Sequence, residues 1–245
     1  MAKSLTGVST IAATKIAHVH ADAPTRAAAV PGEERHVIRG APWDFYDRLT
    51  DALGESSPFR VAYDGQDIEI MTLGPKHERS KGLLGSFIEC VFVGLEIDCE
   101  ELGSTTWKRP ELERGIEADQ CYCFEPSKLE MVRAAAARGS NDIAEYPNPD
   151  LAVEVDLSPS KIDRARIYSE LRVSEVWRLH DGTVSIEQIG VDGSYVPAES
   201  SRFLHVRPEE IIRWLVDEDS GNRVAWRKRL EKWVRTELRP RVRPH

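Results

Sequence analysis

The sequence predicts an α/β (α+β) fold in which a mixed β-sheet is flanked by helices. Extended and helical segments follow one another in the order hairpin, long helix, three strands, helix, strands and helices, which is typical of a sheet covered by helices. The chain has 245 residues, 41% hydrophobic and 30% charged, enough for one sizeable core. No apolar run approaches the roughly 20 residues of a membrane span, so no membrane partner is expected.

Three regions are expected along the chain. Residues 1–35 predict a flexible tail, 36–220 a folded domain, and 221–245 a basic C-terminal helix and tail. The tail lacks the continuous apolar core of a secretion signal. Four cysteines, at positions 90, 99, 121 and 123, form no CxxC pair, which favours reduced thiols in a cytoplasmic protein.

The first elements of the domain are a short helix, a hairpin and a long helix. Apolar residues in 41–53 recur at helical spacing. Asp64-Gly65 lies between two extended runs, which is a strong hairpin signal. A helix is expected from about Pro75 to Leu95, because proline suits a first helical turn and the apolar residues that follow recur at helical spacing.

The second half of the domain is expected to carry most of the sheet. Strands are predicted over 101–108, 115–124 and 151–157, with a short helix inside 125–149. Residues 160–172 predict a helix with Ser160 as its N-cap. Further strands are expected around Asp181-Gly182 and after Asp192-Gly193, and amphipathic helices over 207–219 and 222–238.

The net charge of −8 is unevenly distributed. Residues 222–245 hold nine Lys or Arg against two Glu, a charge of +7, so residues 1–221 carry −15. So acidic a body does not attract DNA over its whole surface, and a nucleic-acid partner would need a local groove, bound cations or the basic end. Trp226 and Trp233 fall near one face of the basic helix, which suits docking on the body, dimerisation or phosphate binding.

Two acids stand on one face of an otherwise apolar strand. In 151–157, Glu154 and Asp156 point the same way, roughly 6–7 Å apart along the strand. Asp119 has a similar place in strand 115–124. If these strands are neighbours, Asp119 and Glu154 converge, and a hard divalent cation such as Mg²⁺ would offset the cost of their burial. A water activated by that cation would attack a phosphorus or carbonyl centre.

Three separated segments, within 71–89, 103–124 and 149–179, together resemble the Uma2 family of restriction-type endonucleases, in the PD-(D/E)xK nuclease superfamily. The resemblance covers roughly residues 40–215. It implies a restriction-endonuclease-like core over 36–220 and Mg²⁺-dependent cleavage of DNA, with Mn²⁺ as a substitute. Asp119 and Glu154 match the family's two metal-binding acids. Glu78 matches an acid that supports the metal from the long helix, although a solvated carboxylate at a helix start is the alternative.

The basic residue of the motif departs from the pattern. The plain motif has lysine two residues after the second acid, where this chain has Asp156. The family commonly moves the lysine to the next helix, four residues before a tyrosine that matches Tyr168, and that position is Arg164. Arginine stays protonated and cannot act as a general base, but it can hold a phosphate, as can Lys161. Asp156 is expected either as a third metal ligand or as a partner of Arg164.

Three further side chains are candidates for substrate contacts. Lys108 and Gln120 could line the cleft, and His77 could reach the acids or simply be exposed. The missing lysine and the acidic body leave open a second hypothesis: a weak or inactive nuclease-fold module used for binding or assembly. A homodimer is compatible with either hypothesis.

Overall fold

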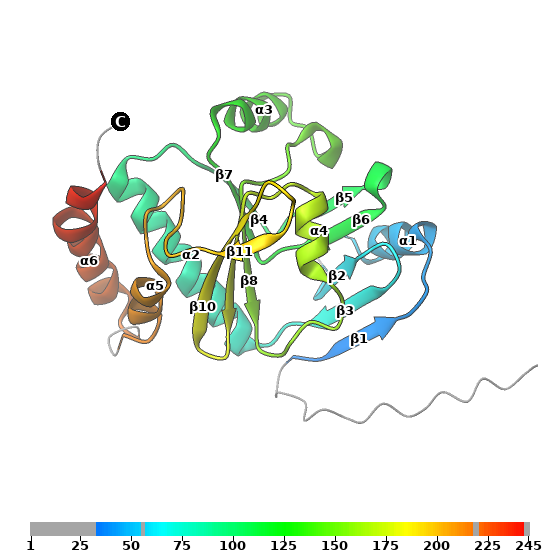
Figure 1. Ribbon diagram of the computed structural model, residues 1–245, viewed down its shortest axis with the longest axis horizontal. Helices are drawn as coiled ribbons and strands as arrows, with labels where there is room; N and C mark the ends of the chain where they lie inside the picture. The colour runs from blue at the N-terminus through cyan, green and yellow to red at the C-terminus, as the bar shows by residue number, and fades with distance from the viewer. Residues whose placement is uncertain (1–32, 55–56, 218–220, 243–245) are drawn as a thin grey trace, which may run out of the picture.

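Two β-sheets and six α-helices form the part of the chain that the computed structural model describes, residues 33–54, 57–217 and 221–242 (Figure 1). The α+β class is confirmed, but the strands form two sheets where one was expected. The first sheet has five strands in the order β1-β3-β2-β6-β5, all antiparallel to their neighbours. Its strands are β1 (Arg35–Ile38), β2 (Phe59–Tyr63), β3 (Ile68–Thr72), β5 (Thr106–Arg109) and β6 (Arg114–Glu117).

The second sheet has six strands in the order β11-β10-β9-β8-β7-β4 and is mixed. β8 and β9 run parallel, and the other neighbours are antiparallel. A parallel pair needs a crossover, which α4 (Arg164–Glu170) supplies. The strands are β4 (Glu100–Gly103), β7 (Gln120–Cys123), β8 (Leu151–Asp156), β9 (Glu175–His180), β10 (Thr183–Ile189) and β11 (Tyr195–Pro197).

Helices cover both faces of the mixed sheet. α2, α5 and α6 pack on one face, and α4 lies on the other, toward the five-stranded sheet (Figure 1). The remaining helix bounds are α1 (Trp43–Leu53), α2 (Pro75–Leu95), α3 (Pro126–Ala137), α5 (Pro208–Leu215) and α6 (Arg223–Trp233). Short helical turns are η1 (Pro110–Leu112), η2 (Ile143–Glu145), the π-helical η4 (Val234–Leu238) and η5 (Arg239–Arg241).

The central strand β8 is buried along its whole length. Its residues Leu151, Val153 and Val155 pack in the core formed with α2, α5 and α6. Ala152 packs instead with Tyr168 of α4, in the core between the sheets. Because strand side chains alternate, Glu154 and Asp156 also point toward α4.

Two of the predicted strands are wrong in extent. Residues 101–108 divide into β4 and β5, and residues 115–124 divide into β6 and β7, with each half in a different sheet. The first break follows Gly103, whose φ of +57° is a left-handed conformation that glycine adopts easily. The second break has no turn residue, because the chain steps straight from one sheet to the other between Glu117 and Gln120.

Two predicted boundaries also differ. Residues 1–32 of the predicted tail lie outside the described residues, but the tail does not extend to 35, since Glu33 and Arg35 are buried and β1 begins at Arg35. The helix expected from 160 begins at Arg164, and its cap is Asp163, whose carboxylate accepts from the Arg166 N–H at 2.9 Å. Ser160 is not the cap, because its hydroxyl donates to Glu69.

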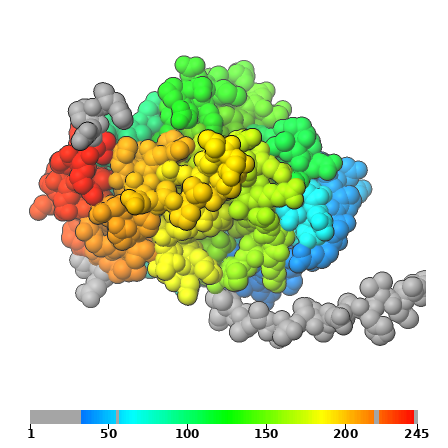
Figure 2. Space-filling model, in the orientation of Figure 1, coloured from blue at the N-terminus to red at the C-terminus, as the bar shows by residue number. Residues whose placement is uncertain are grey.

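The basic C-terminal helix docks on the body. Trp226 and Trp233 are buried against α2 and α5, and Trp226 donates from Nε1 to the Trp214 carbonyl at 2.9 Å. Figure 2 shows α6 beside α5 at one end of the molecule, with β1 and α1 at the other. Of the helices in the described ranges, none is long and apolar enough to cross a membrane.

Candidate active site

Asp119 lies beside the part of β8 that carries Glu154. It directly precedes β7, which pairs with β8 so that Gln120 is opposite Val153. Two hydrogen bonds hold this arrangement: the Asp119 N–H donates to the Val153 carbonyl at 3.1 Å, and the Val155 N–H donates to Asp119 Oδ2 at 2.7 Å. The charge of Asp119 raises the pKa of Glu154, so the two carboxylates are close enough to interact. Their convergence on one metal ion stays a prediction.

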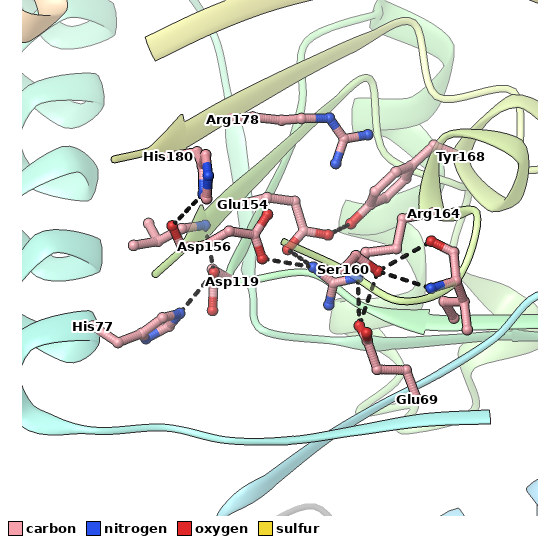
Figure 3. Close-up of polar contacts among 12 residues, drawn as sticks. Glu69, His77, Asp119, Glu154, Asp156, Ser160, Arg164, Tyr168, Arg178 and His180 are labelled. Atoms are coloured by element: carbon pink, nitrogen blue, oxygen red, sulfur yellow. Dashed lines mark hydrogen bonds and ion pairs between the residues drawn. The ribbon is translucent and has the colours of Figure 1, made fainter. Parts of the chain in front are cut away.

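The carboxylate of Glu154 is buried and fully hydrogen-bonded (Figure 3). Arg164 Nη1 donates to Oε2 at 2.9 Å, and the Tyr168 hydroxyl donates to Oε1. Burial raises the pKa of Glu154 to about 7; Arg164 opposes this shift, whereas the charges of Asp156 and Asp119 add to it. Glu154 therefore changes charge near neutral pH rather than in the usual acidic range of carboxyl groups.

The carboxylate of Asp119 is buried but only half satisfied. Oδ2 accepts from Val155 N–H and lies 3.1 Å from His77 Nε2, whereas Oδ1 has no hydrogen-bond partner. Burial acts to raise the pKa of Asp119, but the hydrogen bond and charge of His77 outweigh it and hold the pKa below its usual value. A buried carboxylate oxygen without a donor is costly, so this atom is the natural place for a bound cation.

Arg164 faces three acids, Glu69, Glu154 and Asp156. The expected ion pair with Asp156 is present, with Nη1 3.2 Å from Oδ1. The same Nη1 also binds Glu154, a contact that was not expected, and the prediction that Glu154 holds a metal stays a prediction. Burial disfavours the charge on Arg164, yet these carboxylates raise its pKa overall. Arg164 is thus a fixed cation between Glu154 and Asp156.

The network continues into the five-stranded sheet through Arg35. Its guanidinium binds Glu33 at 3.0 Å, Glu69 at 2.8 Å and also Asp156. All four side chains are at most 10% exposed. Glu33 and Glu69 therefore share the Arg35 guanidinium with Asp156 of β8, the strand that also carries Glu154.

The loop after β8 is fastened to the same two carboxylates. Glu33 accepts from the N–H groups of Leu157 and Ser158 at 3.0 and 3.1 Å, and Glu69 accepts from the Lys161 N–H at 2.6 Å. The Lys161 ammonium donates to the Arg35 carbonyl at 2.8 Å. Of the two cations that the sequence offered, Arg164 contacts Glu154 and Lys161 instead anchors β1.

The other predicted residues lie at different distances from this centre. His77 is fully buried, so the exposed alternative is wrong. Glu78 is about half exposed and contacts the far ring nitrogen of His77 at 3.4 Å, so the imidazole separates it from Asp119. Gln120 donates to the Lys81 carbonyl at 3.3 Å under α2, and Lys108 binds Asp47 and Asp51 on α1.

Sequence reasoning missed four charged residues of the site. Glu33 and Arg35 were assigned to the tail. Glu69 lies between Ile68 and Ile70 in β3, and this alternation of apolar and acidic residues indicates an acid on one face of a strand. Arg178 pairs with Glu154 in the β8–β9 register and has a buried Nη2 without a partner, but only the sheet topology reveals its proximity.

The sequence profile of the Uma2 family, described as "Putative restriction endonuclease", matches residues 43–217. The chain belongs to the Uma2 family. The resemblance noted in the sequence is thereby confirmed, and the matched range contains Asp119, Glu154 and Arg164. No curated protein matched the sequence. Glu33 and Arg35 precede the Uma2 match and α6 follows it, so these parts of the site and the fold lie outside the region shared with the family profile.

The donor set in the Uma2 region fits a hard divalent cation at Asp119. Across the described ranges, no three His, Cys, Asp or Glu side chains are already arranged as a metal cluster. The site nevertheless contains five buried carboxylates, four of which are paired with the guanidinium groups of Arg35 and Arg164. The carboxylates are Glu33, Glu69, Asp119, Glu154 and Asp156. Asp119 Oδ1 is free to coordinate, and Glu154 would add a second oxygen by giving up Arg164 or Tyr168.

Proposed function

We propose that this Uma2 chain is a Mg²⁺-dependent endonuclease that hydrolyses phosphodiester bonds of DNA. Family membership supports a nuclease acting on nucleic acid. The observation that carries the finer proposal is that Asp119, whose Oδ1 is buried and unpartnered, is bonded to the backbone of β8 next to Glu154. Carboxylate oxygens are the ligands that Mg²⁺ prefers, and Mn²⁺ accepts the same donors.

In this proposal Asp119 and Glu154 hold the cation, and His77 keeps Asp119 in position. When bound, a divalent cation neutralises the carboxylates and eases removal of a proton from the attacking water. Arg164 stays protonated, so its role is to bind and orient the phosphate and to stabilise negative charge as the bond breaks. Lys161 is the weaker candidate for that role because its ammonium is bound to the β1 backbone.

The test is cleavage of plasmid and single-stranded DNA by purified protein with Mg²⁺ or Mn²⁺. Asp119→Asn and Glu154→Gln remove one negative charge each without changing side-chain size, and both are expected to abolish cleavage. Glu145→Gln is the matched control, because this carboxylate is exposed on η2 and binds Arg138. Cleavage that persists equally in both site variants would belong to a contaminant, and the proposal would fail.

A second candidate is a nuclease-fold module that binds without hydrolysis. The observation in its favour is that both oxygens of Glu154 are already engaged, by Arg164 and Tyr168. Calorimetric titration with Mn²⁺ separates the two candidates. An ion bound by the native protein and lost in Glu154→Ala supports the enzyme, whereas the absence of binding supports the module.

A further inference from the structure

Two adjoining cavities lie between the start of α2 and the basic helix α6. One, of about 390 Å³, is lined by Ser86 on α2 and by α6 residues that include Arg227 and Lys228. The other, of about 370 Å³, is lined by residues of α2 that include Glu78 and Arg79. Arg223 lines both, so the cavities form one groove, which we call the α2–α6 groove.

Arg223 is held in a fixed position at the junction of the cavities. Its guanidinium lies over the Trp226 ring, 5.1 Å from the centroid, and Nη2 donates to Ser86 Oγ at 2.6 Å and to the Gly82 carbonyl at 3.2 Å. The other guanidinium donors are left for a ligand, and a planar fork of donors matches the oxygens of a phosphate. Stacking and hydrogen bonding reduce the entropy that a long side chain loses on binding.

The groove carries a net positive charge, because Arg79, Arg223, Arg227 and Lys228 line it against Glu78 and Glu231. Within the described ranges, no carboxylate is paired with Arg79, Arg223 or Lys228, whereas Arg227 is paired with Glu89 and Glu231. Three such cations together stand out on a chain whose first 221 residues carry −15. A polyanion is therefore attracted here rather than to the surrounding surface.

A chain of side-chain contacts joins the groove to Asp119. Glu78 lines the groove and contacts His77, and His77 contacts Asp119. From Glu78 to Ser86 the helix rises about 12 Å, which is the length of α2 that lines the groove. In Figure 1, α2 runs from the sheet region that holds the acids to α6 at the end of the molecule.

We infer that the α2–α6 groove binds the phosphodiester backbone of a nucleic-acid strand. This inference rests on the proposed nuclease function. The ligand class follows from the unpaired cations of the groove and from the planar donors of Arg223, which lies on α6, outside the residues matched by the Uma2 profile. Arg223 and Lys228 are its principal contacts.

The test is equilibrium binding of a short fluorescent oligonucleotide by anisotropy, in a chelator so that no cleavage occurs. Single-stranded DNA, duplex DNA and single-stranded RNA are separate arms. The Arg223→Ala/Lys228→Ala double variant is expected to bind about ten-fold or more weakly. Its salt dependence on single strands should fall by about 1.4 in log–log slope, for two lost phosphate contacts.

The matched control is Arg235→Ala/Arg239→Ala, which removes the same charge from the same C-terminal segment. Arg239 binds Glu96 at the opposite end of α2, and neither arginine lines the groove. Equal weakening by both double variants, no weakening by either, or competition by polyglutamate as strong as by unlabelled oligonucleotide would overturn the inference. Oligonucleotide binding that depends on the groove, in a protein that cleaves no DNA, would instead contradict only the proposed nuclease activity.

Discussion

Arg164 is the residue whose replacement tests the charge network most directly. Arg164→Ala removes a donor 2.9 Å from Glu154 and 3.2 Å from Asp156, at a site where the arginine side chain is 3% exposed. In this variant Asp156 would still form its ion pair with Arg35, whereas Glu154 would lose its ion pair with Arg164. Removing one partner of a buried ion pair costs about 3–5 kcal/mol in free energy of unfolding. In a domain of this size that corresponds to a fall of roughly 6–20 °C in melting temperature.

Urea and thermal unfolding followed by circular dichroism would measure this loss. Arg166→Ala is the matched control, two residues further along α4: Arg166 is 60% exposed and pairs with Glu170, so its loss should cost less than about 1 kcal/mol. The difference in free energy of unfolding between the two variants should be largest above pH about 7, where Glu154 is charged. It should become smaller as the Glu154 carboxyl group is protonated. Equal stability of both variants above that pH would refute the assigned ion pair.

Four further outcomes are expected. First, the pKa of Glu154 is raised on folding, so its contribution to stability is complete below the ordinary pKa and is lost as pH rises through about 7; Glu154→Gln should remove that part of the pH dependence in urea unfolding. Second, Asp119→Asn should abolish calorimetric Mn²⁺ binding, and retained binding would exclude Asp119 as a ligand. Third, Trp226→Ala should lower the free energy of unfolding by about 3–5 kcal/mol, because the side chain is fully packed. Fourth, Gly115→Ala should cost about 1–3 kcal/mol, since its Cβ would lie 2.1–2.4 Å from the rigid ring of Tyr46; an unchanged melting temperature would show that the ring can move.

Local signals predicted the elements whose ends are set by their own residues. α2 spans Pro75–Leu95 as expected, with proline in its first turn. The hairpin at Asp64-Gly65 is present, with Gly65 at φ +93° and the Asp64 carboxylate accepting from the Gln66 N–H. In each case the deciding interaction lies within a few residues of the boundary, where sequence patterns are informative.

Interactions between the sheets were beyond the sequence. The step from β6 to β7 carries no turn residue, so an unbroken strand was the natural prediction for 115–124. Asp119 and Glu154 were nevertheless identifiable as candidates, because each is an acid within a largely apolar stretch of the sequence. Arg164 binds Glu154, which lies 10 residues earlier in the chain, and Arg35 binds Asp156, which lies 121 residues later. No local sequence pattern encodes these contacts.

The position of Asp119 has a mechanical consequence. It sits in the short step between the sheets, whereas Glu154 lies in the middle of a strand of the second sheet. An ion held by both side chains would connect this step to the centre of the second sheet, and it would stabilise the folded state in which the two lie together. The stability of the five-stranded sheet would then depend on whether an ion is bound at Asp119 and Glu154, outside that sheet.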